Sequence, residues 1–314
     1  MKKPLVSVIC LCHNHGKYVE HAIFSVLNQK YDNVELIVVD DASDDDSREI
    51  IPKLSKKYGF KTIENKVNLG NCRSFNLGLS ASKGKYLIDL AADDYLYTDR
   101  VKVGVEVLEK FGKSYGVHFC DVELVNENGR SLGTHFLRDK TGKLINEVPT
   151  GDIYQHLVEK YLISAPSMMM SRKVLEELNG YDEDLSYEDF DFWVRSSRDY
   201  KYAFTDMVLI KKLVLKNSLS SIQYQRKNPH VLSTAKVCEK ILSMNTNNQE
   251  NLALLKRIYY ESKWALITEN WEAEKIFLLL KEKLDESSFR MSMEKLIVSV
   301  KPNWYWLWNL LLRI

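Results

Sequence analysis

The stretch Lys85–Tyr95, KYLIDLAADDY, decides the fold that we expect for this chain. Residues 85–90 form a short apolar run rich in β-formers, and two adjacent carboxylates, Asp93 and Asp94, follow it. In an open α/β sheet, the carboxyl end of a buried strand faces the crevice where ligands bind. Two carboxylates there repel each other unless a cation, commonly Mg²⁺ or Mn²⁺, neutralises them. The stretch therefore predicts a divalent metal site that holds a diphosphate. The alternative is that Asp94 caps a helix that begins near residues 97–100.

The flanking sequence alternates strands and helices, as in a parallel sheet with right-handed crossovers. The apolar periodicity predicts strands at 6–12, 34–39 and 61–64, and helices at 18–28 and 47–58. Polar tips follow three of the predicted strands: His13 and Asn14, Asp40 and Asp41, and Asp93 and Asp94. We expect these tips to meet at one edge of the sheet.

A polar loop at 68–79 runs into a further helix and contains Asn68 and Arg73. Such a loop can place backbone N–H groups and a guanidinium beside a nucleotide. It has neither the glycine spacing of a dinucleotide fingerprint nor a Gly-Lys-Ser/Thr phosphate loop. An NAD enzyme and an ATPase are therefore disfavoured.

Composition restricts the class of protein and its partners. Lys and Arg number 44 against 43 Asp and Glu in 314 residues, so no global field favours nucleic acid. Five scattered cysteines without zinc spacing indicate reduced thiols in a cytoplasmic protein. No apolar run approaches the roughly 18 to 20 residues that span a bilayer.

Five segments together resemble glycosyltransferase family 2: Val6–Ile9, Val38–Ser43, Asn68–Gly70, Gly84–Tyr86 and Asp93–Asp94. The resemblance covers about residues 4–225. It implies an α/β fold of the GT-A type, with a mostly parallel central sheet and helices on both faces. It also implies an inverting, metal-dependent hexosyl- or N-acetylhexosaminyltransferase that uses a nucleotide-sugar donor.

The resemblance assigns a donor site to the first half of the chain. Asp40 corresponds to the family's nucleobase reader, and a carboxylate, which only accepts, suits the N3–H of uracil or thymine. The alternative is an Asx-type turn at Asp40 and Asp41 that caps the helix after Ser47. We expect Asp41, Asn68, Arg73 and Asp93 to bind the donor as well, with Asp93 and Asp94 as the metal ligands. Ala91 occupies the first acidic position of the family's metal motif, which removes one contact to ribose or metal.

The stretch 180–195 resembles the family's acceptor-side motif, in which an acidic pair opens an aromatic-rich helix. Asp189 corresponds to the general base, with Glu188 and Trp193 on the acceptor side. A structural alternative is that the acids stabilise the helix N-terminus and that Trp193 packs in the core. Many relatives carry a His near residues 215–216, where this chain has Leu215 and Lys216. The polar segment 134–149 is expected to be a mobile acceptor loop, and the Met168–Met170 triplet is expected in the core.

The predicted domains are a GT-A domain at 1–226 and a helical extension at 227–314. The first has a nucleotide-binding half at about 1–100 and an acceptor half at 101–226. The aromatic terminus Trp304–Ile314 suggests contact with the inner face of the cell membrane. The alternative is that it packs back on the same chain or on a second copy in a homodimer.

We expect a UDP-sugar donor and a saccharide or lipid-linked saccharide acceptor, in cell-surface polysaccharide biosynthesis. Two other functions remain open: a non-catalytic protein that binds nucleotide-sugars or acts as a scaffold, and a nucleotidyltransferase.

Overall fold

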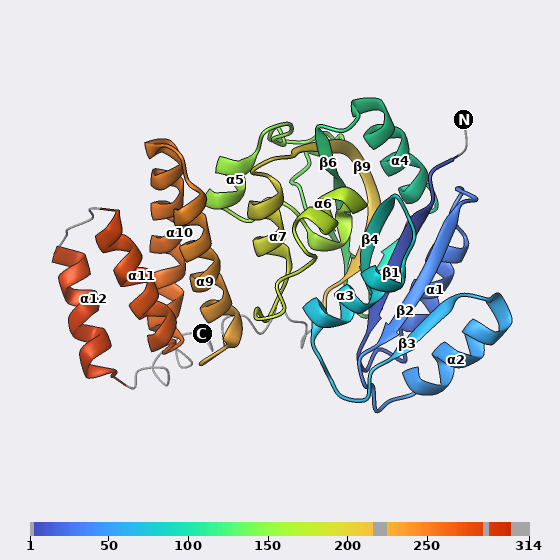
Figure 1. Ribbon diagram of the computed structural model, residues 1–314, viewed down its shortest axis with the longest axis horizontal. Helices are drawn as coiled ribbons and strands as arrows, with labels where there is room; N and C mark the ends of the chain where they lie inside the picture. The colour runs from blue at the N-terminus through green and yellow to red at the C-terminus, as the bar shows by residue number, and fades with distance from the viewer. Residues whose placement is uncertain (1–2, 216–224, 285–288, 303–314) are drawn as a thin grey trace. The chain divides into compact units, whose positions relative to one another are not determined.

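The computed structural model describes residues 3–215, 225–284 and 289–302 (Figure 1). The chain forms two compact units. Unit 1 comprises Met1–Ile153, Ile163–Asp184 and Arg195–Leu215, and unit 2 comprises Tyr154–Leu162, Leu185–Val194 and Lys216–Ile314. The predicted single boundary at 226 therefore differs from this division. The reason is that residues 154–162 and 185–194 pack on the C-terminal helices, as shown below.

The N-terminal half of unit 1 contains the parallel part of the sheet, in the order β3-β2-β1-β4. Its strands are β1 (Val6–Cys12), β2 (Val34–Asp40), β3 (Lys61–Glu64) and β4 (Tyr86–Ala91). Its helices are α1 (Val19–Leu27), α2 (Ser47–Tyr58) and α3 (Asn71–Ala81). The alternation predicted from the sequence is confirmed.

The sheet continues beyond β4 in a mixed order, β8-β6-β9-β5, and β7 pairs with β6. Only β6 and β9 are parallel among these described pairs, so the predicted mostly parallel sheet is mixed in its second half. The strands are β5 (Tyr95–Leu96), β6 (Tyr115–Val125), β7 (Ser131–Thr134), β8 (Met169–Ser171) and β9 (Lys201–Leu213). The helices of this half are α4 (Arg100–Phe111), η1 (Ala165–Ser167) and α6 (Arg172–Glu177).

The alternation of side chains along β1 packs helices on both faces of the sheet. Val8 and Cys10 belong to a buried cluster that includes side chains of α1, α2 and α4. Ile9 points to the other face, where its Cγ2 lies 2.5 Å from the position that a Cβ would take on Gly78 of α3. Helix α3 can approach the strand this closely because it has a glycine there. The three methionines Met168–Met170 are buried in unit 1, as predicted.

Unit 2 is helical. Its elements are α5 (Tyr154–Glu159), most of α7 (Asp189–Ser196), α9 (Pro229–Met244), α10 (Asn248–Ile267), α11 (Trp271–Lys283) and α12 (Phe289–Val300). Helix α10 packs against α5, α9 and α11 (Figure 1). Among the described residues, none of the helices combines the length and apolarity that crossing a bilayer requires. The aromatic terminus Trp304–Ile314 and Lys216 lie outside the described residues.

Candidate functional site

The three polar tips predicted from the sequence lie at one edge of the sheet in unit 1. Strand β1 pairs in parallel with β2 and with β4, and its register sets Cys12 beside Asp40 and Leu11 beside Ala91. The three strands therefore end at nearly the same height in the sheet, and the residues that follow them begin side by side. In open α/β sheets, ligands bind at this carboxyl edge of the strands.

Asp40 ends β2 and forms a tight turn with Ser43. Its Oδ1 accepts hydrogen bonds from Ser43 N at 3.2 Å and from Ser43 Oγ at 2.5 Å. Ala42, inside this turn, has a φ of 59°, in the left-handed region. An Asx turn is closed by the N–H two residues on, so this contact to the third residue is a different turn. It does not cap α2, whose N-cap is Asp46. It engages one carboxylate oxygen, and Oδ2 accepts no hydrogen bond from the described part of the chain. Nucleobase recognition by Asp40 stays a prediction.

Asp41 holds the loop that precedes α3. Its carboxylate accepts hydrogen bonds from Leu69 N, Gly70 N and Asn65 Nδ2, each at 2.8 Å. Gly70 has a φ of 81° and is the residue before α3, so this anchor sets where the helix begins. The carboxylate therefore has a structural role, and its predicted contact to the donor remains untested.

His13 joins the first polar tip to the same loop. Its Nδ1 donates to the carbonyl oxygen of Asp41 at 2.8 Å, because that oxygen can only accept. Its Nε2 then accepts from Asn68 Nδ2 at 3.1 Å. Hydrogen bonds thus link His13, Asp41 and Asn68 at this edge of the sheet.

Arg73 lies in the first turn of α3 and is half exposed. Its Nε is 3.6 Å from Glu183 Oε2, so the guanidinium lies beside an acidic side chain. The ion pair is solvated on both sides and contributes little to stability. The predicted contact between Arg73 and a donor phosphate would compete with Glu183.

Asn76, which the sequence analysis did not single out, clamps residues 180–183 to α3. Its side chain donates to Tyr181 O at 2.9 Å and to Glu183 Oε1 at 3.0 Å, and accepts from Tyr181 N at 3.0 Å. A Cβ added at Gly180, whose φ is 75°, would lie 2.3 Å from Asn76 Oδ1. Because 105 positions separate Asn76 from Tyr181, no local pattern predicts this contact.

Gly180→Ala is expected to lower the free energy of unfolding by roughly 2–4 kcal/mol, from left-handed strain and the clash with Asn76. Gly129→Ala is a matched control. Gly129 has a φ of 74° and open space around the added Cβ, so strain alone of about 1 kcal/mol is expected. Urea denaturation measures both, and equal losses would show that the clamp is not tight.

Asp93 and Asp94 follow β4 in a buried turn. Asp93 Oδ2 lies 4.0 Å from His15 Nε2. Asp94 Oδ1 accepts from Leu213 N in β9 at 3.0 Å. Burial, and then the negative charge of Asp93, raise the pKa of Asp94 to about 8. The alternative that Asp94 caps the next helix is wrong, because β5 intervenes and α4 begins at Arg100 after its N-cap Asp99.

The adjacent buried carboxylates fit a divalent cation that a diphosphate also binds. Within residues 3–215, 225–284 and 289–302, no group of three or more His, Cys, Asp or Glu side chains is arranged to hold a metal. Mg²⁺, however, is usually bound by one or two carboxylates together with substrate phosphates, and keeps several waters. Asp93 and Asp94 provide such a pair. A cation would also offset the repulsion that raises the pKa of Asp94.

The predicted acceptor-side residues Glu188, Asp189 and Trp193 belong to unit 2, whereas the predicted donor-side residues belong to unit 1. Asp189 is the first residue of α7, is partly buried and accepts a hydrogen bond from Phe190 N at 2.6 Å. Trp193 is 2% exposed and packs edge-on against Tyr161. Such an indole packs in the core and offers little face to a sugar. The role of Asp189 as general base stays a prediction, and so does the place of Glu188 near the acceptor.

The predicted acceptor loop at 134–149 is tied to the sheet of unit 1. Arg138 donates from Nε to Asp121 Oδ2 at 2.8 Å and from Nη2 to Asp206 Oδ1 at 2.6 Å. Asp121 is fully buried in β6. At least part of this segment is therefore held by buried charge pairing.

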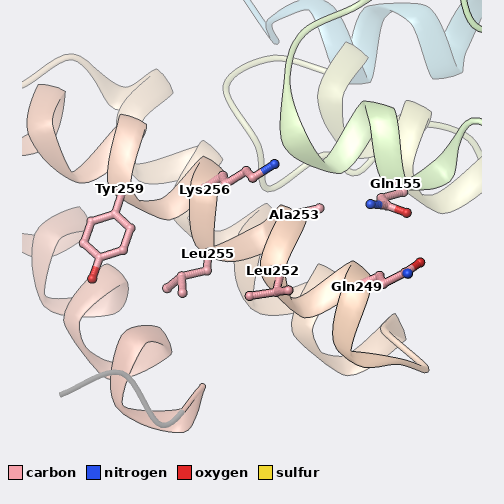
Figure 2. Close-up of a pocket in the computed structure, with 7 residues that line it drawn as sticks. All are labelled: Gln155, Gln249, Leu252, Ala253, Leu255, Lys256 and Tyr259. Carbon is pink, nitrogen blue, oxygen red and sulfur yellow. The ribbon is translucent and has the colours of Figure 1, made fainter.

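Two hollows lie away from Asp40, Asp41, Asp93 and Asp94. One, of about 450 Å³, lies in unit 2 on α5 and α10 and is lined by Gln155, Gln249, Leu252, Ala253, Leu255, Lys256 and Tyr259 (Figure 2). The other, of about 540 Å³, lies in unit 1 and is lined by Glu123, Ser131, Leu132, Gly133, Thr134, Leu137, Arg138 and Val208. The second is lined in part by Thr134, Leu137 and Arg138 of the predicted acceptor loop.

Solved structures with the same fold include S. aureus TarS and a mannosyltransferase. Residues 1–349 of S. aureus TarS in complex with UDP-GlcNAc align with a TM-score of 0.69 at 16% identity, over 95% of this chain and 88% of that fragment. The mannosyltransferase PcManGT from Pyrobaculum calidifontis, in complex with GDP-Man and Mn²⁺, aligns with a TM-score of 0.59 at 16% identity, over 98% of this chain and 84% of PcManGT. At such identity the likeness confirms the mixed α/β GT-A fold.

Similar sequences are uncharacterized glycosyltransferases. The chain is 32% identical to one from Methanocaldococcus jannaschii, over 72% of this chain and 77% of the relative. It is 31% identical to one from Haemophilus influenzae, over 72% of this chain and 70% of the relative. A Rickettsia prowazekii relative is 29% identical over 67% of this chain, and the match spans 64% of the relative's length. Residues 7–178, more than half of the chain, match the family described as "Glycosyl transferase family 2". The chain belongs to glycosyltransferase family 2, as its motifs predict.

Proposed function

We propose that this chain transfers a sugar from a nucleoside diphosphate donor, a UDP-sugar, to a saccharide hydroxyl with inversion of configuration. The observation that carries the proposal is the set of polar side chains at the carboxyl edge of β1, β2 and β4. It combines a buried base-reading candidate, Asp40, with the adjoining carboxylates Asp93 and Asp94. Membership of family 2 supports the reaction class.

The chemistry of Asp40 restricts which nucleobase the donor can carry. A carboxylate accepts hydrogen bonds, so it suits the N3–H of uracil, and it also suits the N1–H of guanine. The two structural neighbours are complexes with UDP-GlcNAc and with GDP-Man. We propose uracil as the base of the donor nucleotide, and guanine is the alternative.

Asp189 is the proposed general base. Its carboxylate would take the proton of the acceptor hydroxyl while that oxygen forms a bond to the anomeric carbon. The bond between the anomeric carbon and the diphosphate oxygen breaks from the opposite face, and the nucleoside diphosphate leaves with the bonding electrons. When bound, a divalent cation would neutralise charge on the departing diphosphate. Asp93 and Asp94 are the residues that would hold it. The proposed acceptor is a saccharide or lipid-linked saccharide of a cell-surface polysaccharide.

Calorimetric titration of UDP, GDP and dTDP, each with and without Mn²⁺, tests the donor site. We expect UDP to bind more tightly than GDP, and Mn²⁺ to increase its affinity. Tighter binding of GDP would overturn the assignment of uracil. Failure of all three to bind under either condition would overturn the donor site and favour the scaffold function.

Transfer itself is tested with the sugar nucleotides of the base that binds, offered with lipid-linked saccharide fractions. Release of nucleoside diphosphate that depends on the acceptor would support a transferase. The anomeric configuration of the product, read by NMR, distinguishes inversion from retention.

A further inference from the structure

We propose that the C-terminal helices α9 and α10 position the proposed base Asp189, and that Arg257 of α10 is the central positioning residue. The proposal rests on the function proposed above, in which Asp189 takes the proton of the acceptor. It gives the C-terminal helical region a role in the reaction. All residues concerned belong to unit 2.

Arg257 is a charged side chain buried between α10 and residues 157–161. It is 2% exposed. Its Nε donates to Val158 O at 3.1 Å, its Nη2 donates to Leu157 O at 3.4 Å, and its Nη1 lies 3.1 Å from Glu261 Oε1. The guanidinium therefore ties the end of α5 to α10.

The same guanidinium lies against the residue that follows Asp189. Its Cζ is 4.1 Å from the ring centre of Tyr161 and 4.7 Å from that of Phe190. The two rings meet edge to face, 5.3 Å apart. Cations attract aromatic faces, and a planar guanidinium stacks on them as an ammonium cannot. Phe190 is fully buried, so Arg257 packs in the core on the side chain of the residue that follows Asp189.

Helix α9 holds the residues that precede Asp189. Ser186 N donates to Ser233 Oγ at 2.9 Å, and Ser186 Oγ lies 2.7 Å from His230 Nδ1. The hydroxyl of Tyr187 lies 2.6 Å from Thr234 Oγ1. The chain is thus hydrogen-bonded to α9 two and three residues before the proposed base.

Helix α9 also holds α7 just after Asp189. Lys240 Nζ lies 2.6 Å from Asp191 Oδ1, and Asp191 is 1% exposed. Asp191 therefore faces α9, which accounts for one of the three acids at the start of α7. Contacts on both sides leave Asp189 itself partly buried on a segment whose neighbours are fixed.

Stability alone does not require these buried charges. Replacing a buried ion pair with apolar side chains of similar size is often neutral or stabilising. Catalysis, in contrast, depends on placing a base within hydrogen-bond reach of the reacting proton, and displacement by about 1 Å can cost about 10²-fold in rate. A rigid clamp around Asp189 meets this requirement.

The test is Arg257→Lys, which keeps a positive charge near Glu261 and removes the planar stacking group. We expect kcat for transfer to fall by about 10- to 100-fold, while the Kd for UDP changes less than about twofold. Lys256→Met is the matched control, since Lys256 is one residue away on α10 and its side chain is 65% exposed. It is expected to leave kcat unchanged.

A double-mutant cycle separates positioning of Asp189 from general damage. If Arg257 acts through Asp189, Arg257→Lys added to Asp189→Asn will lower the residual rate by less than about twofold. An equal loss in both backgrounds would overturn the proposal, as would a wild-type kcat in Arg257→Lys. If Arg257→Lys does not fold, Thr234→Val replaces it, with an expected several-fold loss of kcat that is also absent in Asp189→Asn.

The outcomes distinguish this proposal from the proposed function. Transfer by the wild type that Asp189→Asn abolishes and Arg257→Lys leaves intact overturns the positioning role alone. A wild type that binds nucleotide but transfers no sugar overturns the proposed function and the positioning role with it.

Discussion

Asp189→Asn is expected to lower the rate of acceptor-dependent transfer by about 10²- to 10⁴-fold, the range contributed by general base catalysis. An amide cannot take the proton of the acceptor hydroxyl. Its oxygen can still accept the hydrogen bond from Phe190 N that Asp189 accepts now, so α7 should begin at the same residue. Steady-state release of nucleoside diphosphate with acceptor present measures the effect.

Nucleotide binding should survive this substitution, because the predicted donor-side residues lie on the strand ends and loops of unit 1. Asp184→Asn is the matched control, because Asp184 is an exposed acid five positions earlier. This variant should transfer sugar at the wild-type rate. Full turnover by Asp189→Asn would show that another group takes the proton. Equal loss in both variants would point to a general effect of charge on this segment.

Asp93→Ala is expected to remove most of the gain in UDP affinity that Mn²⁺ provides, a loss of at least about tenfold. Two carboxylates that share a cation with a diphosphate are its main protein ligands, so loss of one weakens the site. Without metal, the same substitution should leave UDP affinity equal or slightly higher, because it removes a negative charge that repels the diphosphate. Calorimetry measures the affinity for UDP in the presence and in the absence of Mn²⁺.

Asp32→Ala controls for loss of one acid, since Asp32 pairs with Lys3 on the surface and its side chain is 87% exposed. It should bind UDP as the wild type does in both conditions. An undiminished Mn²⁺ effect in Asp93→Ala would show that Asp93 does not hold the metal. The proposed donor site would then rest on Asp40 alone.

The sequence predicts the parallel half of the sheet well, because that half is built from local patterns. Apolar runs with β-formers place β1, β2 and β4, and helical periodicity places α1 and α2. Parallel pairing then brings His13, Asp41 and the turn at Asp93 to one edge. The family motifs occur on these same segments, so family and fold could both be assigned before any contact was known.

The second half of the sheet was predicted less well. Its strands pair across long separations and in both directions, as β6 does with β8 and β9. Periodicity identifies a strand but does not contain its partner or direction. The antiparallel insertion of β8 between β4 and β6 is therefore a result of tertiary packing.

By itself, the sequence determined the family, the mixed α/β class and the carboxylates that end the strands, because these depend on residue types at short spacing. Only the tertiary structure decided what each carboxylate contacts. Asp41 holds the loop before α3, and Asp94 meets the backbone of Leu213, 119 positions away. It also assigned residues 185–194 to the unit of the C-terminal helices, where Arg257 stacks on Phe190. Such contacts follow from how distant segments pack, and the spacing of residues along a chain does not record them.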